Sequence, residues 1–299
     1  MDYREKIEQE KIIAQTVRDF YNQTPFPDFE LERFPSKEAL RETAWPFAKA
    51  LDRCIPREAS VLDVGAGTGQ LAALLSLEPV DVWGVDFSES SLAKAGALKE
   101  RLGLHTLTLR NVDILNASHI DAIGRTFDYV LCLGVLHHTA DPRGGFRNIA
   151  RLVKPGGHIA VGLYNTFGRA FHKARIALAR TIFQKNKAVK DWFMKIQIGD
   201  LSDNKRTRGW WNDQYAHPHE TTHTIGEALA WFRENNIEYQ GSIPSLGADR
   251  RPFLEIAGVW DKHARPPSWA RRVYAQYAWT WRIHKDGGYW VTCGRRLPS

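Results

Sequence analysis

The chain has 299 residues, of which 43% are apolar and 25% are charged, a composition that fits a folded globular protein and excludes a disordered or fibrous one. Its net charge of +7 comes from two late segments: residues 169–208 hold eleven Lys and Arg against three Asp and Glu, and residues 262–299 hold eight against one. Three scattered cysteines, a charged start and no apolar run of about 18 residues indicate a reducing cytosol, no export signal and no membrane span.

The N-terminal stretch predicts a helix from about Arg4 to Tyr21, because its apolar residues recur at helical spacing. Those apolar residues are Ile12, Ile13, Val17 and Phe20. Pro25 and Pro27 then force an extended path.

From Ser60 the chain alternates short apolar runs with helix-forming segments. The runs are SVLDV, VDVWGVD ending at Asp86, LHTLTLRNVDIL ending near Asp113, FDYVLCLGVLHH, and GGHIAVGLYN after the turn KPGG. Strands separated by helices favour parallel pairing through right-handed crossovers. The sequence therefore predicts a doubly wound, mostly parallel α/β sheet with helices on both faces.

Small and acidic residues follow the first three expected strands, at the edge where such folds bind ligands. Gly65, Gly67 and Gly69 form G-x-G-x-G, which lets a ligand approach the backbone, although a tight turn with close helix packing explains the same pattern. Asp86 is placed to accept hydrogen bonds from a ribose diol, and Asp113 from an adenine amine. Each acid alone is better explained as a solvated loop residue or helix cap. The placement of the glycines and the two acids at one edge of the sheet favours a binding site for an adenosine that carries a charged tail.

The segments LDVGAGTG, GVDFSESSL, NVDIL, FDYVLCLGVLHHTADP and LVKPGGHIAVGLYN, in this order and spacing, resemble the class I S-adenosylmethionine-dependent methyltransferases. The resemblance covers roughly residues 58–165, a little over a third of the chain. It implies a Rossmann-like fold, S-adenosyl-L-methionine as cofactor and methyl transfer as the activity, and it says little about the acceptor.

The resemblance also implies roles for single residues around the methionine and ribose. Asp63 and the turn at residues 65–69, including Ala66, would hold the methionine end, and Asp86 would hold the ribose. The stretch FYNQTPFPDF resembles a segment that folds over the cofactor in some family members, which makes Tyr21 a further candidate. An ordinary packing helix followed by a turn is the alternative for that stretch.

Around the adenine, the resemblance implies four contacts. Phe87 and Ile114 would flank the ring, and Asp113 would bond its amine. Leu133 would lie near the cofactor through its backbone.

The expected organisation is one domain with additions. An N-terminal helical lid (1–57) precedes the cofactor-binding α/β core (58–168). A basic, mainly helical cap on the acceptor side (169–240) follows, and C-terminal strands (241–299) complete the sheet.

Two late segments admit three interpretations each. Residues 169–198 carry apolar residues at helical spacing opposite lysines and arginines, and RRVYAQYAWTWRIHK mixes arginines with tyrosines and tryptophans. Each segment could be a helix packed on the domain with its basic face in solvent. It could also be a helix that lies on an anionic membrane surface, or a basic patch that binds the phosphates of a nucleic acid.

The stretch HPHETTH, His217 to His223, contains H-E-x-x-H, in which two histidines share a zinc ion only on a helix. Its threonines form helices poorly, and Thr224 with Glu227 forms a capping box that starts a helix after the motif. No metal site is therefore expected, and the stretch is assigned to the acceptor-side cap.

The expected reaction is displacement at a sulfonium methyl by an oxygen, nitrogen or carbon nucleophile of a small-molecule acceptor. His138 is the candidate base because imidazole titrates near neutrality, and Tyr164, at the end of the fifth strand, is a second candidate catalytic residue. His137 and His138 could instead only shape their loop. The rival functions are RNA methylation, suggested by the basic segments, and a non-catalytic S-adenosylmethionine-binding partner protein.

Overall fold

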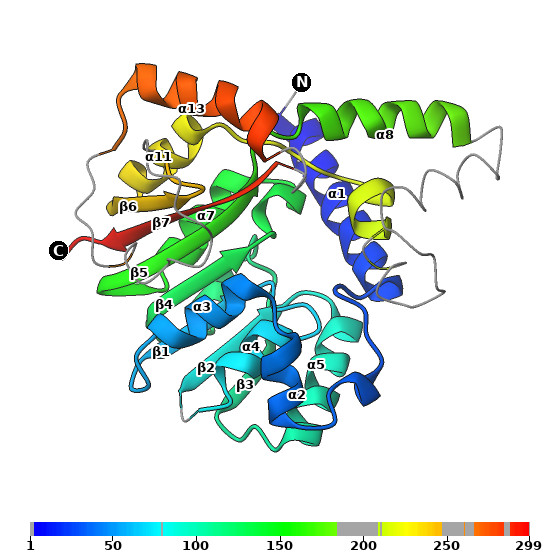
Figure 1. The fold of residues 1–299 in the computed structure, drawn as a ribbon, viewed down its shortest axis with the longest axis vertical. Coiled ribbons are helices and arrows are strands. Elements are labelled where there is room, and N and C mark those ends of the chain that lie inside the picture. The colour runs from blue at the N-terminus through cyan, green and yellow to red at the C-terminus, as the bar shows by residue number, and fades with distance from the viewer. Residues whose placement is uncertain are drawn as a thin grey trace.

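The computed structural model describes residues 3–78, 80–183, 209, 211–246, 260, 266–283 and 288–298. Its centre is a seven-stranded sheet in the order β3-β2-β1-β4-β5-β7-β6, in which β1 to β5 run parallel and β7 is antiparallel to both neighbours (Figure 1). This confirms the expected mostly parallel α/β sheet. The strands are β1 (Ser60–Val64), β2 (Asp81–Asp86), β3 (Leu107–Asn111), β4 (Phe127–Leu133), β5 (Val153–Tyr164), β6 (Ile237–Ile243) and β7 (Tyr289–Arg296).

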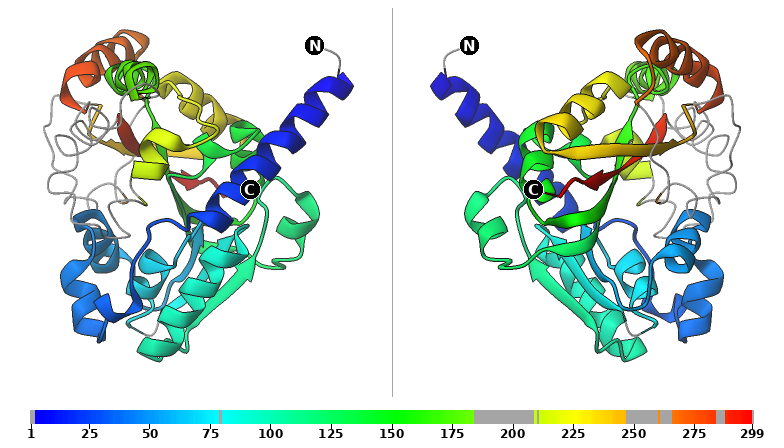
Figure 2. Two further views of the ribbon diagram at one scale, coloured as in Figure 1. Left: turned by 90° about the vertical axis from the view of Figure 1, so that its right-hand side faces the viewer. Right: turned by 90° about the vertical axis from the view of Figure 1, so that its left-hand side faces the viewer.

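Helices cover both faces of the sheet and bury an apolar core on each (Figures 1 and 2). On one face lie α3 (Pro46–Cys54), α4 (Gln70–Leu75) and α5 (Glu89–Leu102), and on the other lie α7 (Pro142–Ala150), α11 (Ile225–Glu234) and α13 (Trp269–Arg282). The shorter elements are α2 (Lys37–Thr43), α6 (Ala117–Asp121) and the single turns η1 (Leu31–Arg33), η2 (Leu136–His138) and η3 (Asn212–Ala216).

Local signals in the sequence set the helix starts. The Ser88 hydroxyl accepts a hydrogen bond from the Ser91 amide and caps α5. Thr224 and Glu227 form the expected capping box of α11. The helix α11 therefore begins after HPHETTH.

The sequence predicts the turn KPGG before the fifth strand. In the structure the turn lies inside that strand, β5. Pairing between β4 and β5 jumps from Phe127–Val153 to Tyr129–His158, so residues 154–157 bulge out while the strand continues. Gly156 has a φ of 78°, which allows the bulge without ending the strand.

The N-terminal helix α1 (Tyr3–Gln23) crosses the molecule beside α5, and its C-terminal end reaches the carboxyl ends of the strands (Figure 1). The helix α8 (Ala170–Phe183) follows β5, and its first turn meets the last turn of α13. Residues 184–208 of the expected basic cap lie outside the described residues. Within the described ranges no helix has the length and apolar character needed to cross a bilayer.

Candidate active site

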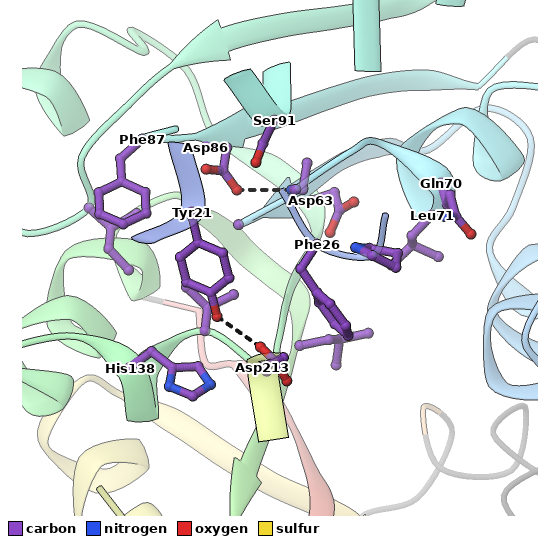
Figure 3. A pocket seen from close by; sticks show the side chains of 18 of the residues that line it. Tyr21, Phe26, Asp63, Gln70, Leu71, Asp86, Phe87, Ser91, His138 and Asp213 are labelled. Carbon is purple, nitrogen blue, oxygen red and sulfur yellow. Dashed lines mark hydrogen bonds between the residues drawn. The ribbon is translucent and has the colours of Figure 1, made fainter. Parts of the chain in front are cut away.

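A cavity of about 390 Å³ lies at the carboxyl ends of the central strands, and we refer to it as the strand-end cavity (Figure 3). Every candidate site residue from the sequence lines it except Gly69. Those that line it are Tyr21, Asp63, Gly65, Ala66, Gly67, Asp86, Phe87, Asp113, Ile114, Leu133, His138 and Tyr164.

The glycine turn after β1 forms the floor of this cavity. Gly65, Gly67 and Gly69 have φ values of 68°, 54° and 80°, a region that side chains disfavour. A Cβ atom on Gly67 would lie 2.3 Å from the carbonyl oxygen of Phe26, and one on Gly69 would lie 2.6 Å from the Cβ of Ala95. Gly69 is therefore required for packing against α5, while Gly65 and Gly67 expose backbone to the cavity.

Asp63 lines the cavity from within β1 and is only 3% exposed. Its Oδ2 atom is buried and has no hydrogen-bond partner among the described residues. Burial, with a smaller contribution from Asp86, raises the pKa of Asp63 to about 7. A cationic group entering the cavity would satisfy this oxygen and stabilise its charged form.

Asp86 ends β2 and receives one backbone donor on each oxygen. The amide of Ser88 donates to Oδ1 at 2.8 Å, and the amide of Gly67 donates to Oδ2 at 2.9 Å (Figure 3). Burial raises the pKa of Asp86, and these amides oppose that rise. Each carboxylate oxygen keeps a second lone pair, which is available to a diol.

Asp113 lies beyond β3 and is paired with a residue that sequence reasoning missed. Arg18, on α1, donates to its Oδ2 at 3.0 Å, and the amide of Leu115 donates to Oδ1 at 2.9 Å. The Arg18 guanidinium also lies 5.5 Å from the centre of the Phe87 ring. The sequence predicted the helix that carries Arg18, but it could not predict the pairing with Asp113, which lies 95 residues further along the chain.

The segment after α1 is fastened to the glycine turn and to the start of α5. The Thr68 hydroxyl donates to the Pro27 carbonyl at 2.7 Å, and the Ser88 hydroxyl donates to the Asn22 side-chain oxygen at 2.9 Å. Phe26 and Pro27 themselves line the cavity. Polar contacts on two sides thus hold this segment against the glycine turn.

A buried polar cluster closes the side of the cavity opposite Asp86. The Tyr21 hydroxyl donates to Asp213 Oδ1 at 3.1 Å (Figure 3), and the Gln214 amide nitrogen donates to Asp213 Oδ2 at 2.9 Å and to the Tyr164 hydroxyl at 2.7 Å. Arg169 donates to the Gln214 side-chain oxygen at 2.9 Å, which fixes the orientation of that amide. Burial raises the pKa of Asp213.

Arg169 is completely buried behind Tyr164. Its guanidinium carbon lies 3.6 Å from the centre of the Tyr164 ring, and it makes a two-pronged ion pair with Glu220. Such a pair is costly to break from one side, because the remaining charge would be buried alone. The Arg169–Glu220 ion pair therefore holds Gln214 and Tyr164 of the polar cluster in place.

The imidazole of His138 has a defined protonation pattern. Its Nδ1 lies 3.0 Å from the carbonyl oxygen of His219, and because a carbonyl only accepts, Nδ1 carries the proton and Nε2 keeps a lone pair. Burial lowers the pKa of His138 to about 4, so the ring is neutral near pH 7. His137 is equally buried but does not line the cavity, which separates the two histidines.

The remaining wall of the cavity is apolar. It is formed by α2, α3, α4 and one side chain from β7. Its residues are Leu40, Ala44, Trp45, Ala48, Leu71, Leu74 and Tyr289.

The H-E-x-x-H residues are not helical. His223 donates from its amide to the Tyr164 carbonyl at 2.8 Å and forms an isolated parallel bridge with Asn165, so the segment is extended beside the end of β5. Glu220 is bound to Arg169. Across the described residues no group of three or more His, Cys, Asp or Glu is arranged to hold a metal ion.

Asp213 and Gln214 were missed as site residues, although their stretch was assigned to the cap. They belong to the single turn η3, and no spacing in the sequence marks that turn. Tyr289 comes from β7, far from the other site residues in the chain. These positions depend on long-range packing alone.

Residues 62–159 match the model of the methyltransferase domain family. These residues therefore form a methyltransferase domain of the kind that the sequence resemblance implied, the class I S-adenosylmethionine-dependent methyltransferases. Curated relatives include a ubiquinone biosynthesis O-methyltransferase of Pectobacterium atrosepticum, 35% identical over 39% of this chain and 47% of the relative. Another, from Marinobacter nauticus, is 29% identical over 50% of this chain and 62% of the relative.

An uncharacterized protein of Synechococcus is 24% identical over 77% of this chain and 60% of its own length. Among solved structures, PKMT2 from Rickettsia typhi, also solved in complex with AdoHcy, has the same fold, with a TM-score of 0.57 at 15% identity over 84% of this chain and 52% of that one. This methyltransferase chain thus spans about half to three fifths of the length of the curated relatives it matches.

The cofactor of this family, S-adenosylmethionine, fits the residues of the strand-end cavity. The partnerless oxygen of Asp63 suits the ammonium of its methionine end. The Gly67 backbone lines the cavity, and Asp86 has lone pairs for the ribose. Phe87 and Ile114 offer apolar surface to the adenine.

Proposed function

We propose that this chain methylates an oxygen nucleophile on a small, largely apolar acceptor. The observation that carries the proposal is a single cavity lined by the glycine turn and Asp86, by the polar cluster around Asp213, and by His138, whose Nε2 keeps a lone pair. The names of the curated relatives, which are O-methyltransferases of ubiquinone biosynthesis, support an oxygen acceptor.

In this proposal Asp63, Asp86 and Asp113 hold the methionine end, the ribose and the adenine amine. The bound cofactor supplies an electrophilic methyl group on a sulfonium. Tyr21 and Phe26 lie over it and exclude water, which would otherwise compete as a nucleophile. Positioning the acceptor in line with the methyl accounts for up to roughly 7–11 kcal/mol of the barrier.

His138 acts as the base. Its Nε2 would accept the hydroxyl proton of the acceptor as the acceptor oxygen is methylated. The bound cofactor would supply the methyl group and leave as the neutral thioether. The carboxylate of Glu220 favours the imidazolium that results, because it raises the pKa of His138 against the effect of burial. The proton then leaves to solvent.

The acceptor would lie against the apolar wall, with its hydroxyl directed at the polar cluster. Trp45 at the rim of this wall is half exposed, so it offers a ring surface to an entering molecule. The Tyr164 hydroxyl, held by Gln214, is the further candidate contact for the acceptor.

The test is a labelled-methyl assay in which the protein and radioactive S-adenosylmethionine are added to cell extract divided into small molecules, lipids and RNA. Label in a small organic compound, in the small-molecule or lipid fraction, supports the proposal when mass spectrometry places the methyl group on oxygen. A methyl group on nitrogen or carbon would contradict the oxygen acceptor. Label in RNA would establish the rival function. Cofactor binding with no label in any fraction would favour a non-catalytic role.

A further inference from the structure

The inner face of α13 packs on the core. Ala275, Trp279 and Ile283 are buried, and the ring of Trp279 lies 5.5 Å from that of Trp290 on β7. Gln276 accepts a hydrogen bond of 2.9 Å from the first amide of α11. These contacts fix the rotation of α13 and therefore decide which side chains face outward.

The outer face of α13 is aromatic where a surface helix is normally polar. Its large side chains recur at intervals of four residues, which places them along one stripe. The exposed apolar residues of α13 are Trp269 (71% exposed), Val273 (45%), Tyr274 (67%), Tyr277 (67%) and Trp281 (60%).

The helix α8 extends this surface. Its first turn meets the last turn of α13 at the top of Figure 1, where the two helices follow one another end to end, and the rings of Phe171 and Trp281 are 5.1 Å apart. Neither helix contains Asp or Glu, and among the cations whose side chains the structure describes Lys173 and Arg271 are exposed while Arg175 and Arg272 are half-buried. We refer to the outer faces of these two helices as the α8–α13 surface.

We propose that the α8–α13 surface docks on an anionic lipid bilayer. Tryptophan and tyrosine favour the boundary between headgroups and acyl chains, and basic side chains beside them attract anionic headgroups. Lys173 and Arg271 are exposed on the two helices. Each donates one hydrogen bond to the protein, Lys173 Nζ to the Thr222 hydroxyl at 3.1 Å and Arg271 Nε to the Leu246 carbonyl at 3.2 Å, and each keeps further N–H donors for a headgroup.

Two other occupants fit the surface less well. A second copy docked face to face would bring two basic surfaces together, which is repulsive. A nucleic acid is bound by cations that follow a groove and by rings on which bases stack, whereas here an apolar stripe containing Val273 runs along a convex helix.

The experiment is vesicle co-sedimentation of the full chain with phosphatidylcholine alone and with an equal mixture of phosphatidylcholine and phosphatidylglycerol. We expect binding to the anionic vesicles that weakens as salt is added. The triple variant Trp269→Ala, Tyr274→Ala, Tyr277→Ala should bind about tenfold more weakly or worse. Arg271→Glu should lose a similar factor on anionic vesicles only.

The matched control is Leu297→Ala, which removes an exposed apolar side chain elsewhere on the surface and should bind as the wild type does. Thermal unfolding of each variant verifies the fold, since the replaced side chains are exposed. Absence of vesicle binding by the wild type, or equal binding by the triple variant, would overturn the proposal. So would light scattering that finds a wild-type dimer split by the triple variant, or a DNA oligonucleotide that displaces the vesicles. None of these results depends on methyl transfer.

Discussion

The Tyr21 hydroxyl donates a hydrogen bond of 3.1 Å to Asp213, which lies 192 residues further along the chain. This contact joins the C-terminal end of α1 to the turn η3 at the strand-end cavity. Asp213 is buried and Tyr21 is half-buried, so losing this hydrogen bond would leave a buried carboxylate oxygen with one donor fewer.

Removing that contact should loosen both partners. In Tyr21→Phe the ring stays but Asp213 loses a donor, so we expect the free energy of unfolding to fall by about 1–3 kcal/mol. Denaturant unfolding measures this, with the exposed Tyr274→Phe as control. An unchanged midpoint in Tyr21→Phe would mean that the hydrogen bond does not hold the lid.

Asp86→Ala should weaken cofactor binding by roughly 10- to 150-fold, which corresponds to about 1.5–3 kcal/mol for hydrogen bonds to a charged group. Titration calorimetry with S-adenosylmethionine measures it. Asp81→Ala, at the opposite end of β2, is the control and should bind normally. Because Asp86 also accepts from Gly67 and Ser88, circular dichroism must first establish that the variant is folded; a folded variant with full affinity would remove Asp86 from the site.

Cofactor affinity should depend on pH through Asp63. In the free protein its pKa is about 7, and an ammonium at Oδ2 would favour the ionised form, so binding below that pH must release a proton. Affinity should therefore rise about tenfold for each unit of pH up to the folded pKa and level off above it. Calorimetry in buffers of different ionisation enthalpy counts the proton. Asp63→Asn should bind weakly with a flat profile, and a steep profile in that variant would assign the proton to another group.

His138→Asn should lower kcat by about 10²- to 10⁴-fold while leaving cofactor affinity unchanged, because the side chain contributes general-base catalysis. The rate is measured on the extract fraction that takes up label. The exposed His105→Asn is the control. If His138→Asn retains full activity, the acceptor ionises without this base and His138 only shapes its loop.

The cofactor end of the cavity could be predicted from sequence because parallel strands carry their carboxyl ends to one edge. Once strands were expected before Gly65, Asp86 and Asp113, their proximity followed without knowledge of the packing. The acceptor end could not be predicted in this way. Asp213 and Gln214 lie in a single turn whose position is set by Arg169 and Tyr164, and no local periodicity reports such long-range contacts.

Two further features, the pairing of Arg18 and the path of the KPGG segment, could not be predicted from the sequence. The helix around Arg18 was predictable, but its pairing with Asp113 depends on the angle at which α1 crosses the strand ends. At KPGG the turn composition was interpreted as a strand boundary, whereas two glycines let β5 bulge and continue because β4 and β7 hold it on both sides.

Because β7 lies between β5 and β6, the sheet cannot be completed until the last strand of the chain has been synthesised. A nascent chain that has emerged only through β6 has all five parallel strands, but β5 has an open edge and β6 has no neighbour to pair with. Tyr289, at the start of β7, must also arrive before the cavity wall is closed. Folding of the sheet and completion of the site are thus coupled to synthesis of the same late strand, and a chain stalled before it would expose a pairing edge that invites aggregation.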